Sequence, residues 1–589
     1  MILIFGGTTE GRLAVEVCEQ AGQPFYYATW GTAQRVPLRH GIRLSGDMGL
    51  DDIRRFCLEK DIRLIIDASH PFAESLHLNI AQSGMPVIRL SRKEVTCPDN
   101  VVRCRDFDDA VSRLKAHAPR CLLALTGVKT IASLQAYWQQ HETFFRILDR
   151  SDSRAIASAC GFPEDHLLFY DVAETPSLPS EEDERQLMQH THADAIITKD
   201  SGQSGGLEAK INAASALGLK IFVVDAPDYV GLFPSDAILR QVTGHHTLRR
   251  AIEELAPDFF PLRTGLTTGT CATAAVVAAT RHLLMGETPA AVLVHLADGE
   301  TITVPVGFAD GKAFCIKDFS DDPDVTRGCR IMAKVEPRTE GGASIRFLQG
   351  EGVGRVTLPG LGIPVGEPAI NPVPRQMITD AVQSLTDQSL DITISVENGR
   401  ELAERTFNSR VGVVDGISII GTSGIVSPLS NEAFVDSIRR ELQVARAIGC
   451  DSIGLASGKK GEEALLSQEP SLRVIHYGNF IGAALAQAHE LGFRRVVLGI
   501  MLGKAVKLAE GHLDTHSHKV LMNKTFLAEV AKRAGVADAD DVLQGITMAR
   551  ELWALMPPAF FDSIHDYCLH HARTVFPDGE LDIRIIQHE

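Results

Sequence analysis

Three short polar segments in the first part of the chain combine residue types that bind ligands. The segment Gly6-Gly7-Thr8-Thr9-Glu10-Gly11 follows an apolar run and precedes a helical pattern. Glycines let the backbone approach a ligand closely, and a helix N-terminus offers N–H groups to a phosphate. The spacing differs from the G-x-G-x-x-G fingerprint, so a nucleotide loop and a tight strand–helix turn are both compatible with it. Its place after the first expected strand favours the nucleotide.

The other two segments also follow apolar runs. In Asp67-Ala68-Ser69-His70-Pro71-Phe72-Ala73, the imidazole of His70 lies at the carboxyl end of an expected strand. In α/β proteins, ligands bind at the carboxyl ends of the strands. A ligand-binding role and a structural role for His70 are therefore about equally consistent with its position. Asp200-Ser201-Gly202-Gln203-Ser204-Gly205-Gly206 is rich in glycine and serine, with Lys199 and Lys210 beside it. This composition favours an anion-binding nest over a plain turn.

A hydroxyl-rich segment in the second half precedes an Ala- and Val-rich helix expected over 272–285. It reads Leu262-Arg263-Thr264-Gly265-Leu266-Thr267-Thr268-Gly269-Thr270-Cys271-Ala272. We expect Thr270 to cap the helix, and the surrounding hydroxyls to bind backbone groups or a ligand carboxylate. A first-turn position would lower the pKa of Cys271. No histidine is evident nearby in the sequence, so a packing role for this cysteine is favoured.

Two other clusters have the composition of metal sites, and we predict no metal in either. The segment 317–326 holds four aspartates but lacks the glycine and terminal glutamate of a calcium loop, which favours turn and capping roles. The segment 511–518 has a His-x₃-His-x-His spacing, which is not a tetrahedral zinc pattern. Polar substrate contacts, including one from His516, are favoured there.

The elements that would position these residues follow the rhythm of an α/β fold. A surface loop is expected over 174–184, and β-branched alternation over 291–360 predicts an α+β subdomain. We therefore predict two Rossmann-like α/β lobes in the N-terminal half. The C-terminal half is predicted to contain the α+β subdomain followed by a Rossmann-like α/β subdomain. Strands are expected at 1–5, 64–68, 87–90, 122–125, 195–199, 221–224, 452–456, 474–476 and 495–500.

The 589 residues are too many for one hydrophobic core, so several domains are expected. Helix-forming residues near 248–255 run into a proline-bracketed stretch that ends at Pro261. We predict one domain over 1–248, a linker over 249–261 and a second domain over 262–589.

Composition excludes several classes of function. Lys and Arg total 58 against 75 Asp and Glu, and the resulting net charge of −17 argues against nonspecific nucleic-acid binding. No apolar run is long enough to span a membrane. Eleven scattered cysteines without a Cys-x-x-Cys pair fit a reducing compartment. With no basic leader before the first apolar run, a cytoplasmic protein is expected.

The three N-terminal segments together resemble the precorrin-6A and cobalt-precorrin-6A reductase family, of CobK/CbiJ type. The resemblance implies that NADPH or NADH binds between two Rossmann-like lobes and delivers a hydride to the macrocycle. It places Gly6, Gly7 and Thr8 on the pyrophosphate, and turns the 199–206 segment towards the nicotinamide or the substrate. Thr-Trp-Gly at 29–31 stands where Thr-Tyr-Gly is expected, which leaves the choice of nicotinamide open. Cofactor binding is assigned to Thr29, Ser201, Gly202 and Gly205, and substrate binding to His70 and Lys199.

Residues 262–589 resemble the cobalt-precorrin-5B C1-methyltransferase family, of CbiD type. Matching segments lie at 262–272, 317–326, 350–354, 369–375, 401–410, 416–426 and 503–511. The resemblance implies methyl transfer from S-adenosylmethionine to ring carbon C1. The sequence departs from the family at Gly458-Lys459-Lys460-Gly461, where a Thr-Gly-Arg-like turn is expected, and at the additional imidazole of His518.

Corrin precursors carry several carboxylates, for which cationic side chains are the natural partners. Substrate binding is therefore assigned to Arg263, Thr267, Thr268, Arg375, Arg410, Lys504, Lys507 and His516. The predicted function is a bifunctional cobalamin-biosynthesis enzyme acting on an anionic cobalt-corrin precursor, with other enzymes of that pathway as possible partners. A non-catalytic tetrapyrrole or nucleotide carrier, or a chain with only one active half, is the alternative.

Overall fold

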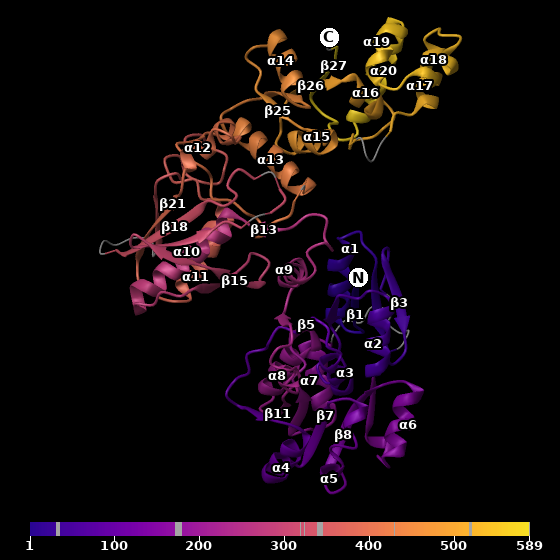
Figure 1. The fold of residues 1–589 in the computed structure, drawn as a ribbon, viewed down its shortest axis with the longest axis vertical. Helices are drawn as coiled ribbons and strands as arrows, with labels where there is room; N and C mark the ends of the chain where they lie inside the picture. The colour runs from indigo at the N-terminus through magenta and orange to yellow at the C-terminus, as the bar shows by residue number, and fades with distance from the viewer. Residues whose placement is uncertain are drawn as a thin grey trace. The chain divides into compact units, whose positions relative to one another are not determined.

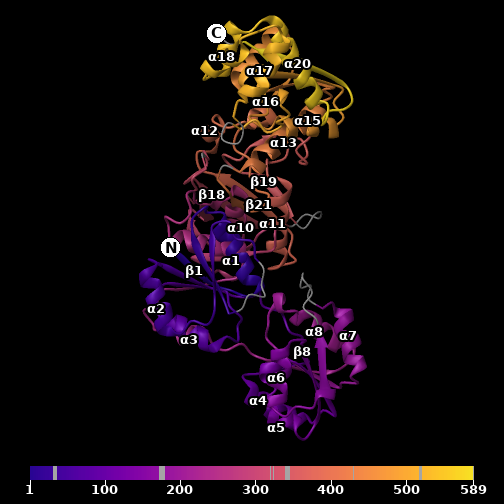
Figure 2. The same ribbon diagram turned by 90° about the vertical axis from the view of Figure 1, so that its right-hand side faces the viewer.

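The computed structural model describes residues 1–30, 36–170, 179–318, 320–322, 324–338, 345–428, 430–516 and 521–587. Contacts between Cα atoms divide the chain into two compact units, Met1–Pro261 and Leu262–Glu589. In the ribbon, unit 1 is coloured from indigo to magenta and unit 2 from magenta to yellow (Figures 1 and 2). No helix among the described residues is long and apolar enough to cross a lipid bilayer.

The first sheet of unit 1 is a parallel sheet with the order β12-β5-β4-β1-β2-β3. Helices α1 and α9 pack on one face, and α2 and α3 on the other. Because both faces are covered, β1 is apolar along its whole length and β4 is apolar up to its last residue, the buried Asp67. The strands are β1 (Ile2–Phe5), β2 (Phe25–Thr29), β3 (Gly41–Ser45), β4 (Leu64–Asp67), β5 (Val87–Leu90) and β12 (Leu239–Val242); the helices are α1 (Thr9–Glu19), α2 (Leu50–Glu59), α3 (Glu74–Gln82) and α9 (His245–Leu255).

The second sheet of unit 1 is also parallel, with the order β6-β11-β10-β7-β8-β9. Helices α4, α5 and α6 cover one face, and α7 and α8 the other. The strands are β6 (Val101–Cys104), β7 (Cys121–Leu125), β8 (Glu142–Leu148), β9 (Leu167–Tyr170), β10 (Ala195–Lys199) and β11 (Lys220–Val224); the helices are α4 (Phe107–His117), α5 (Gln135–Trp138), α6 (Ser151–Ala159), α7 (Glu181–His190) and α8 (Leu207–Ala216). The two parallel-sheet bodies predicted for this half are confirmed.

Each sheet of unit 1 has a point at which the direction of strand addition reverses. In the first sheet this point lies between β1 and β4, and in the second between β7 and β10. Loops that leave two such strands diverge to opposite faces and open a crevice at the carboxyl edge, where α/β proteins bind ligands. The two loops in the first sheet begin at Gly6 and Ala68, and those in the second begin at Thr126 and Asp200.

The first part of unit 2 is built around helix α10 (Thr268–Met285), which is buried along most of its length. It packs on the mixed sheet β16-β17-β18-β21-β19 and against α11 (Pro372–Gln383). The sheet strands are β16 (Gly307–Ala309), β17 (Lys312–Ile316), β18 (Arg330–Pro337), β19 (Ile345–Gln349) and β21 (Leu390–Val396). Smaller pairs are β13 (Gly265–Leu266) with β23 (Ile425–Val426), β14 (Ala291–His295) with β15 (Thr301–Pro305), and β20 (Arg355–Val356) with β22 (Val413–Val414); helix α12 spans Gly399–Ala403.

The second part of unit 2 is a parallel four-stranded sheet with the order β25-β24-β26-β27. Its direction reverses between β24 and β26, so a third crevice of the same kind is expected there. The strands are β24 (Ser452–Ala456), β25 (Val474–His476), β26 (Arg495–Met501) and β27 (Glu580–Ile586). The helices are α13 (Asn431–Ala447), α14 (Lys459–Gln468), α15 (Ile481–Glu490), α16 (Leu502–Ala509), α17 (Lys524–Arg533), α18 (Ala539–Gly545), α19 (Leu552–Leu555) and α20 (Pro558–Ala572).

All nine expected strands are found, within one residue at their ends. Two local predictions are wrong. Helix α10 begins at Thr268, four residues before its expected start, because Thr267 rather than Thr270 caps it and accepts from the Thr270 N–H at 3.2 Å. The loop expected over 174–184 is too long at its C-terminal end, because helix α7 already begins at Glu181. Ser180 caps this helix, and its side chain accepts from the Asp183 N–H. Residues 174–178 lie outside the described part of the chain.

The segment 249–261 is folded rather than an extended linker. Helix α9 continues to Leu255, and Ile252, Phe259 and Phe260 belong to the core beneath the first sheet. The arginine Arg249 lies 4.0 Å from the centre of the Phe260 ring. The division between the units therefore falls between Pro261 and Leu262.

Ending a fragment of unit 1 at residue 248 should destabilise it, compared with a fragment that ends at 261. The shorter fragment loses the buried Ala251 and three large buried apolar side chains, each of the three worth about 1.5–3 kcal/mol. We therefore expect its unfolding free energy to be lower by at least about 5 kcal/mol. Urea unfolding followed by circular dichroism measures this difference. Equal midpoints for the two fragments would contradict the packing of Phe259 and Phe260.

Candidate functional site

The glycine-rich turn after β1 is held in a shape that leaves space in front of it. Gly7 has a φ of +97°, and a Cβ there would meet no other atom within 4 Å. Thr8 caps α1 by accepting from the Gly11 N–H at 3.0 Å, and its hydroxyl donates to the Ala68 carbonyl at 2.6 Å. The second bond ties the loops after β1 and β4 together at the reversal point. Gly6 has no room for a side chain, since its Cβ would lie 2.3 Å from the Tyr27 ring.

Beneath the His70 loop lies a fully buried group of charged side chains. The Asp67 carboxylate accepts from Arg89 at 2.9 Å, from His77 Nδ1 at 2.8 Å and from the Ser69 hydroxyl at 2.6 Å. Burial by itself raises the pKa of Asp67, but Arg89 and these hydrogen bonds outweigh it and hold that pKa well below its usual range. The other ring nitrogen of His77 lies 3.0 Å from the His70 carbonyl. Asp67 therefore fixes the backbone from which His70 projects.

His70 itself is exposed, and its Nδ1 accepts from the Phe72 N–H at 3.2 Å. Surrounding protein atoms, Arg92 and Lys199 lower the pKa of His70 to about 3, so the ring is neutral at physiological pH. The Lys199 ammonium lies 4.9 Å from the centre of the Phe72 ring. Desolvation and the nearby Lys129 lower the pKa of Lys199. Two residues predicted to bind substrate, His70 from the first sheet and Lys199 from the second, thus lie near one another.

Arg92 joins the two lobes of unit 1, and the sequence reasoning missed it. It follows β5, pairs with Glu10 of α1 at 3.2 Å and donates to the Ser201 carbonyl at 2.7 Å. Ser204 donates to the same Glu10 carboxylate. Burial raises the pKa of Glu10, but Arg92 and Ser204 outweigh this and leave it below the ordinary value of a glutamate.

The turn 199–206 packs directly on Arg92. A Cβ on Gly202 would lie 2.6 Å from Arg92 Cβ, and one on Gly205 would lie 2.3 Å from Ser201 Cβ. The Ser201 hydroxyl donates to the Gly205 carbonyl at 3.1 Å. Lys210 donates to the same carbonyl at 3.2 Å, and burial lowers the pKa of Lys210 to about 8. Both glycines predicted in this turn are therefore required by close packing.

Thr29 is buried at the carboxyl end of β2, and the neighbouring Trp30 is 75 % exposed. The Lys129 ammonium, from the loop after β7, lies 4.6 Å from the centre of the Trp30 ring. Gly31 lies outside the described residues. The first-sheet loops and the second-sheet loops thus face each other at Trp30 as well as at Arg92.

In unit 2, the predicted Thr267 and Thr268 are buried and already bonded to backbone. Thr267 caps α10, and Thr268 accepts from the Ile420 N–H at 2.8 Å. The Thr270 hydroxyl donates to the Gly424 carbonyl at 2.6 Å. The hydroxyl-rich motif therefore docks the 416–424 loop onto the start of α10.

Two of the predicted arginines are committed to protein partners. Arg263 pairs with Asp321, whose carboxylate also accepts from the Arg263 N–H at 2.7 Å. Arg375 donates to the Ile370 carbonyl at 2.7 Å and pairs with Glu367 at 2.7 Å. Their contacts hold loops together.

The third predicted arginine belongs to a polar chain at the end of β25. Arg410 pairs with Glu462 at 2.8 Å, and Glu462 in turn lies 2.9 Å from His476 Nε2. Burial raises the pKa of Glu462, but Arg410 and His476 outweigh it and lower that pKa. Glu462 and His476 were missed because they have no distinctive spacing; only the fold brings the first turn of α14 beside the last residue of β25.

Lys504 and Lys507 lie on α16, which follows β26. Lys504 donates to the Gly478 carbonyl, and Lys507 donates to the Thr515 carbonyl at 3.2 Å. Desolvation and Lys507 together lower the pKa of Lys504 to about 8, and desolvation lowers the pKa of Lys507. His516 lies in the loop after α16, and its N–H donates to Asp514 at 3.2 Å. His518 lies outside the described residues.

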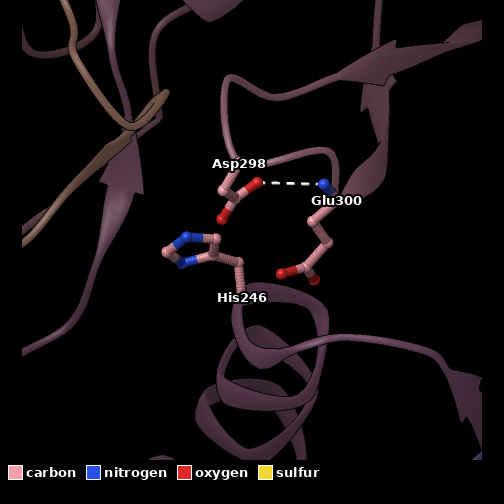
Figure 3. Close-up of side chains that lie close together, drawn as sticks. All are labelled: His246, Asp298 and Glu300. Carbon is pink, nitrogen blue, oxygen red and sulfur yellow. Dashed lines mark hydrogen bonds between the residues drawn. The ribbon is translucent and has the colours of Figure 1, made fainter. Parts of the chain in front are cut away.

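The aspartates of unit 2 act largely on the backbone and on a buried lysine. Asp318 accepts from the Leu266 N–H at 2.6 Å, and Asp324 pairs with the buried Lys317 at 2.7 Å. An aspartate also binds a backbone N–H in the β14–β15 turn, where Asp298 accepts from the Glu300 N–H at 2.9 Å (Figure 3). Asp324 also accepts from the Thr326 N–H at 2.8 Å, a turn role that the sequence favours, whereas the Asp318 contact joins segments that are distant in the sequence.

Cys271 is fully buried, and the lowered thiol pKa considered for a helix start does not occur. A hydrogen bond with Cys315 and burial raise the pKa of Cys271 well above its ordinary value. The favoured packing role agrees with this environment.

The fold defines a two-part α/β protein whose parallel sheets each reverse strand order at one point, where α/β proteins bind ligands. Residues 1–254 match the family model described as precorrin-6x reductase CbiJ/CobK, and residues 257–428 match the CbiD model. The chain therefore joins a member of the CbiJ/CobK reductase family to a member of the CbiD methyltransferase family.

Individual relatives carry corresponding names. The cobalt-precorrin-5B C(1)-methyltransferase of Prosthecochloris aestuarii is 42% identical over 344 residues, covering 54% of this chain and 92% of that protein. Its counterpart in Pseudomonas fluorescens (strain Pf0-1) is 40% identical over 344 residues, covering 55% and 93%. Among solved structures, a CobK precorrin-6A reductase is 22% identical with a TM-score of 0.35 and covers 43% of this chain and 97% of its own.

Replacing Asp67 by asparagine should strongly destabilise unit 1. The change leaves Arg89 buried without a counter-charge, a loss of about 3–5 kcal/mol. The folded pKa of Asp67 lies below the unfolded value of about 3.9, so its contribution is present above that value and is lost as pH falls towards the folded pKa. The stability gap between wild type and Asp67→Asn, measured by urea unfolding, should therefore narrow below pH about 4.

The exposed Asp61, which pairs with Arg63 at 3.3 Å, provides the matched control. Asp61→Asn should change stability by less than about 0.5 kcal/mol. Similar losses for both variants would contradict the role given to the buried carboxylate.

Proposed function

We propose that the chain is a bifunctional enzyme of cobalamin biosynthesis. Its second half methylates C1 of cobalt-precorrin-5B with S-adenosylmethionine, giving cobalt-precorrin-6A. Its first half reduces cobalt-precorrin-6A to cobalt-precorrin-6B with NADPH or NADH. The observation that carries this proposal is that both halves of one chain match families acting on precorrins. The product of one reaction is the substrate of the other, which gives the fusion a purpose.

The proposed domains are the reductase over 1–248 with its packed extension to 261, and the methyltransferase over 262–589. All eleven cysteines lie among the described residues and are free thiols, which supports a cytoplasmic location. An anionic cobalt-corrin precursor is the proposed partner, since cationic groups lie at the carboxyl edge in both units.

For the reductase half, we assign the pyrophosphate of the nicotinamide to Gly6, Gly7 and Thr8. The open space in front of Gly7 and the start of α1 suit a phosphate. When bound, the reduced nicotinamide supplies the hydride. Thr29, Ser201, Gly202 and Gly205 complete the proposed cofactor site, Arg92 positions the 199–206 turn, and Lys199 and neutral His70 face the substrate.

For the methyltransferase half, we assign S-adenosylmethionine to the crevice between β24 and β26, where Gly458 leaves open space. The sulfonium supplies an already activated methyl group, so the chain's task is to align the reacting carbon with it. Lys504, Lys507 and His516 are proposed to bind substrate carboxylates, with Arg410 near them on the same edge. Four other predicted residues hold the supporting loops in place: Arg263, Thr267, Thr268 and Arg375. Any of them could bind the substrate only by giving up its hydrogen bonds or ion pairs with the protein.

The proposal is tested by supplying cobalt-precorrin-5B, S-adenosylmethionine and a reduced nicotinamide together. Mass spectrometry should show the gain of a methyl group and then of two hydrogens, one as hydride and one as a proton from solvent. Omitting the nicotinamide should stop the reaction at cobalt-precorrin-6A. Nicotinamide oxidation without the methyl donor, on the unmethylated substrate, would contradict the proposed order, and no methyl transfer would favour the carrier alternative.

Gly7→Ala should weaken binding of the nicotinamide cofactor by at least about tenfold, because a methyl group would occupy the space assigned to the pyrophosphate. Equilibrium dialysis with NADPH and NADH measures the effect. Gly22→Ala is the matched control: Gly22 has a φ of +65°, equally open surroundings, and lies past the other end of α1. Both changes carry the strain of a left-handed residue, about 1–2 kcal/mol, so equal weakening would indicate misfolding and refute the assignment.

The lowered pKa of Lys504 predicts a pH dependence of substrate binding. The ammonium form, which binds carboxylates, is lost as pH rises through about 8. The KM for the corrin substrate in methyl transfer should therefore rise between pH 7 and 9. Arginine remains charged over this range, so Lys504→Arg should flatten the rise. An unchanged pH profile in that variant would remove Lys504 from the substrate site.

A further inference from the structure

Four loops and helix starts of unit 2 converge at the carboxyl edge of its parallel sheet. Helices α15 and α16 follow β25 and β26, so they begin at this carboxyl edge. Helix α13 leads into the amino end of β24, so it too begins at the carboxyl edge. Helix α13 packs against α15 (Figures 1 and 2). The loop 511–516 joins them, since the Gly482 N–H donates to the Leu513 carbonyl at 3.0 Å.

An aromatic pair lies at this edge. Phe434, in the first turn of α13, is 40% exposed, and its ring centroid lies 5.6 Å from that of the half-buried Phe480. The Phe434 ring rests on Gly478, where a Cβ would come within 2.9 Å of two ring carbons. Gly478 has a φ of +58°, so both its conformation and its lack of a side chain are needed. We call Phe434, Gly478 and Phe480 the aromatic ledge.

Two ammonium groups border the aromatic ledge. Lys504 donates to the carbonyl of Gly478 itself. Lys507 donates to the Thr515 carbonyl at 3.2 Å, and the Thr515 N–H donates to the Asn479 carbonyl at 3.0 Å. Lys504 is therefore bonded directly to the loop 478–479 beneath Phe434, and Lys507 is linked to that loop through Thr515.

The two rings of the aromatic ledge are inclined at 40° to each other. An aromatic surface edged by cations fits a large conjugated ring with anionic side chains. The methyl donor fits it poorly, because its sulfonium carries a positive charge that the two ammonium groups would repel. Peptides and nucleic acids lack the combination of a broad ring and peripheral carboxylates. We infer that the aromatic ledge is the binding site of the corrin macrocycle in the methyltransferase half. One face of the ring packs on Phe434 and Phe480, and the ring's carboxylates pair with Lys504 and Lys507. This inference rests on the proposed methylation.

The binding probe is dicyanocobyrinic acid, an air-stable cobalt corrin with free carboxylates. Its fully methylated ester has the same ring without the negative charges. On the full chain, hydrogen–deuterium exchange with mass spectrometry should show slower exchange over 431–438 and 477–485 with the acid. The ester should protect these amides less, because it cannot pair with the lysines. Half-saturation concentrations come from the protection at 477–485, which separates this site from any corrin bound by unit 1.

Phe434→Ala should raise the half-saturation concentration by about tenfold, the scale of one lost aromatic contact and its burial. Lys504→Met should weaken binding of the acid and leave that of the ester unchanged. The matched aromatic control is Phe526→Ala, since Phe526 also pairs with a ring, Tyr567, at 5.6 Å. Phe526 follows Asn523, which contacts Glu510 past the far end of α16. The lysine control is Lys524→Met, which removes a donor to the Gln544 carbonyl.

Three results would each contradict the aromatic ledge as the macrocycle site. They are protection elsewhere in unit 2, no protection by either corrin, and equal effects of the ledge and control variants. The proposed function is judged separately, by methyl transfer to cobalt-precorrin-5B. Methyl transfer with normal KM in Phe434→Ala would refute the ledge alone. Loss of methyl transfer in the wild type would refute the proposed function.

Discussion

Parallel strand pairing is the constraint on which the candidate sites depend. A strand can pair in parallel with its neighbour only if the chain crosses back over a face of the sheet, and this places every strand's carboxyl end at the same edge. Three sheets of this chain follow that rule, and each reverses its direction of strand addition once. Residues far apart in the sequence, such as Thr8 and Ala68, meet there as a direct consequence.

Buried charge then fixes the loops that leave these edges. In unit 1, Asp67 holds Arg89, His77 and the loop below His70, and Arg92 links the lobes through Glu10 and the Ser201 carbonyl. A buried charge without its partner is costly, so each pair admits few alternative arrangements. These contacts bring together glycine-rich backbone, the His70 imidazole and the partly desolvated Lys199. In unit 2, Lys504 and Lys507 are desolvated in a similar way but bind backbone carbonyls.

The strands were predictable because buried parallel strands are short apolar runs bounded by glycine and polar turns, as at 195–199. The glycine motifs were predictable for the same reason, since Gly7 and Gly202 need conformations or close contacts that other residues oppose. The start of α10 was misplaced because several threonines can cap a helix, and only tertiary contacts select Thr267. Arg92, Glu462 and His476 could not be predicted: each acts through a partner distant in sequence, and nothing in local spacing marks them. The segment 249–261 was predicted to be a linker because prolines bracket it in the sequence. The sequence alone does not show that Phe259 and Phe260, between these prolines, are buried in the core.

The central claim is that each unit holds its own nucleotide-derived cofactor at the carboxyl edge of its sheets. Equilibrium dialysis of the full chain with oxidised NADP and S-adenosylhomocysteine, separately and together, measures this directly. The account predicts one equivalent of each per chain, with neither ligand displacing the other, and with NADP retained by fragment 1–261 and S-adenosylhomocysteine by fragment 262–589. Mutual displacement, or binding of both ligands by the same fragment, would contradict it.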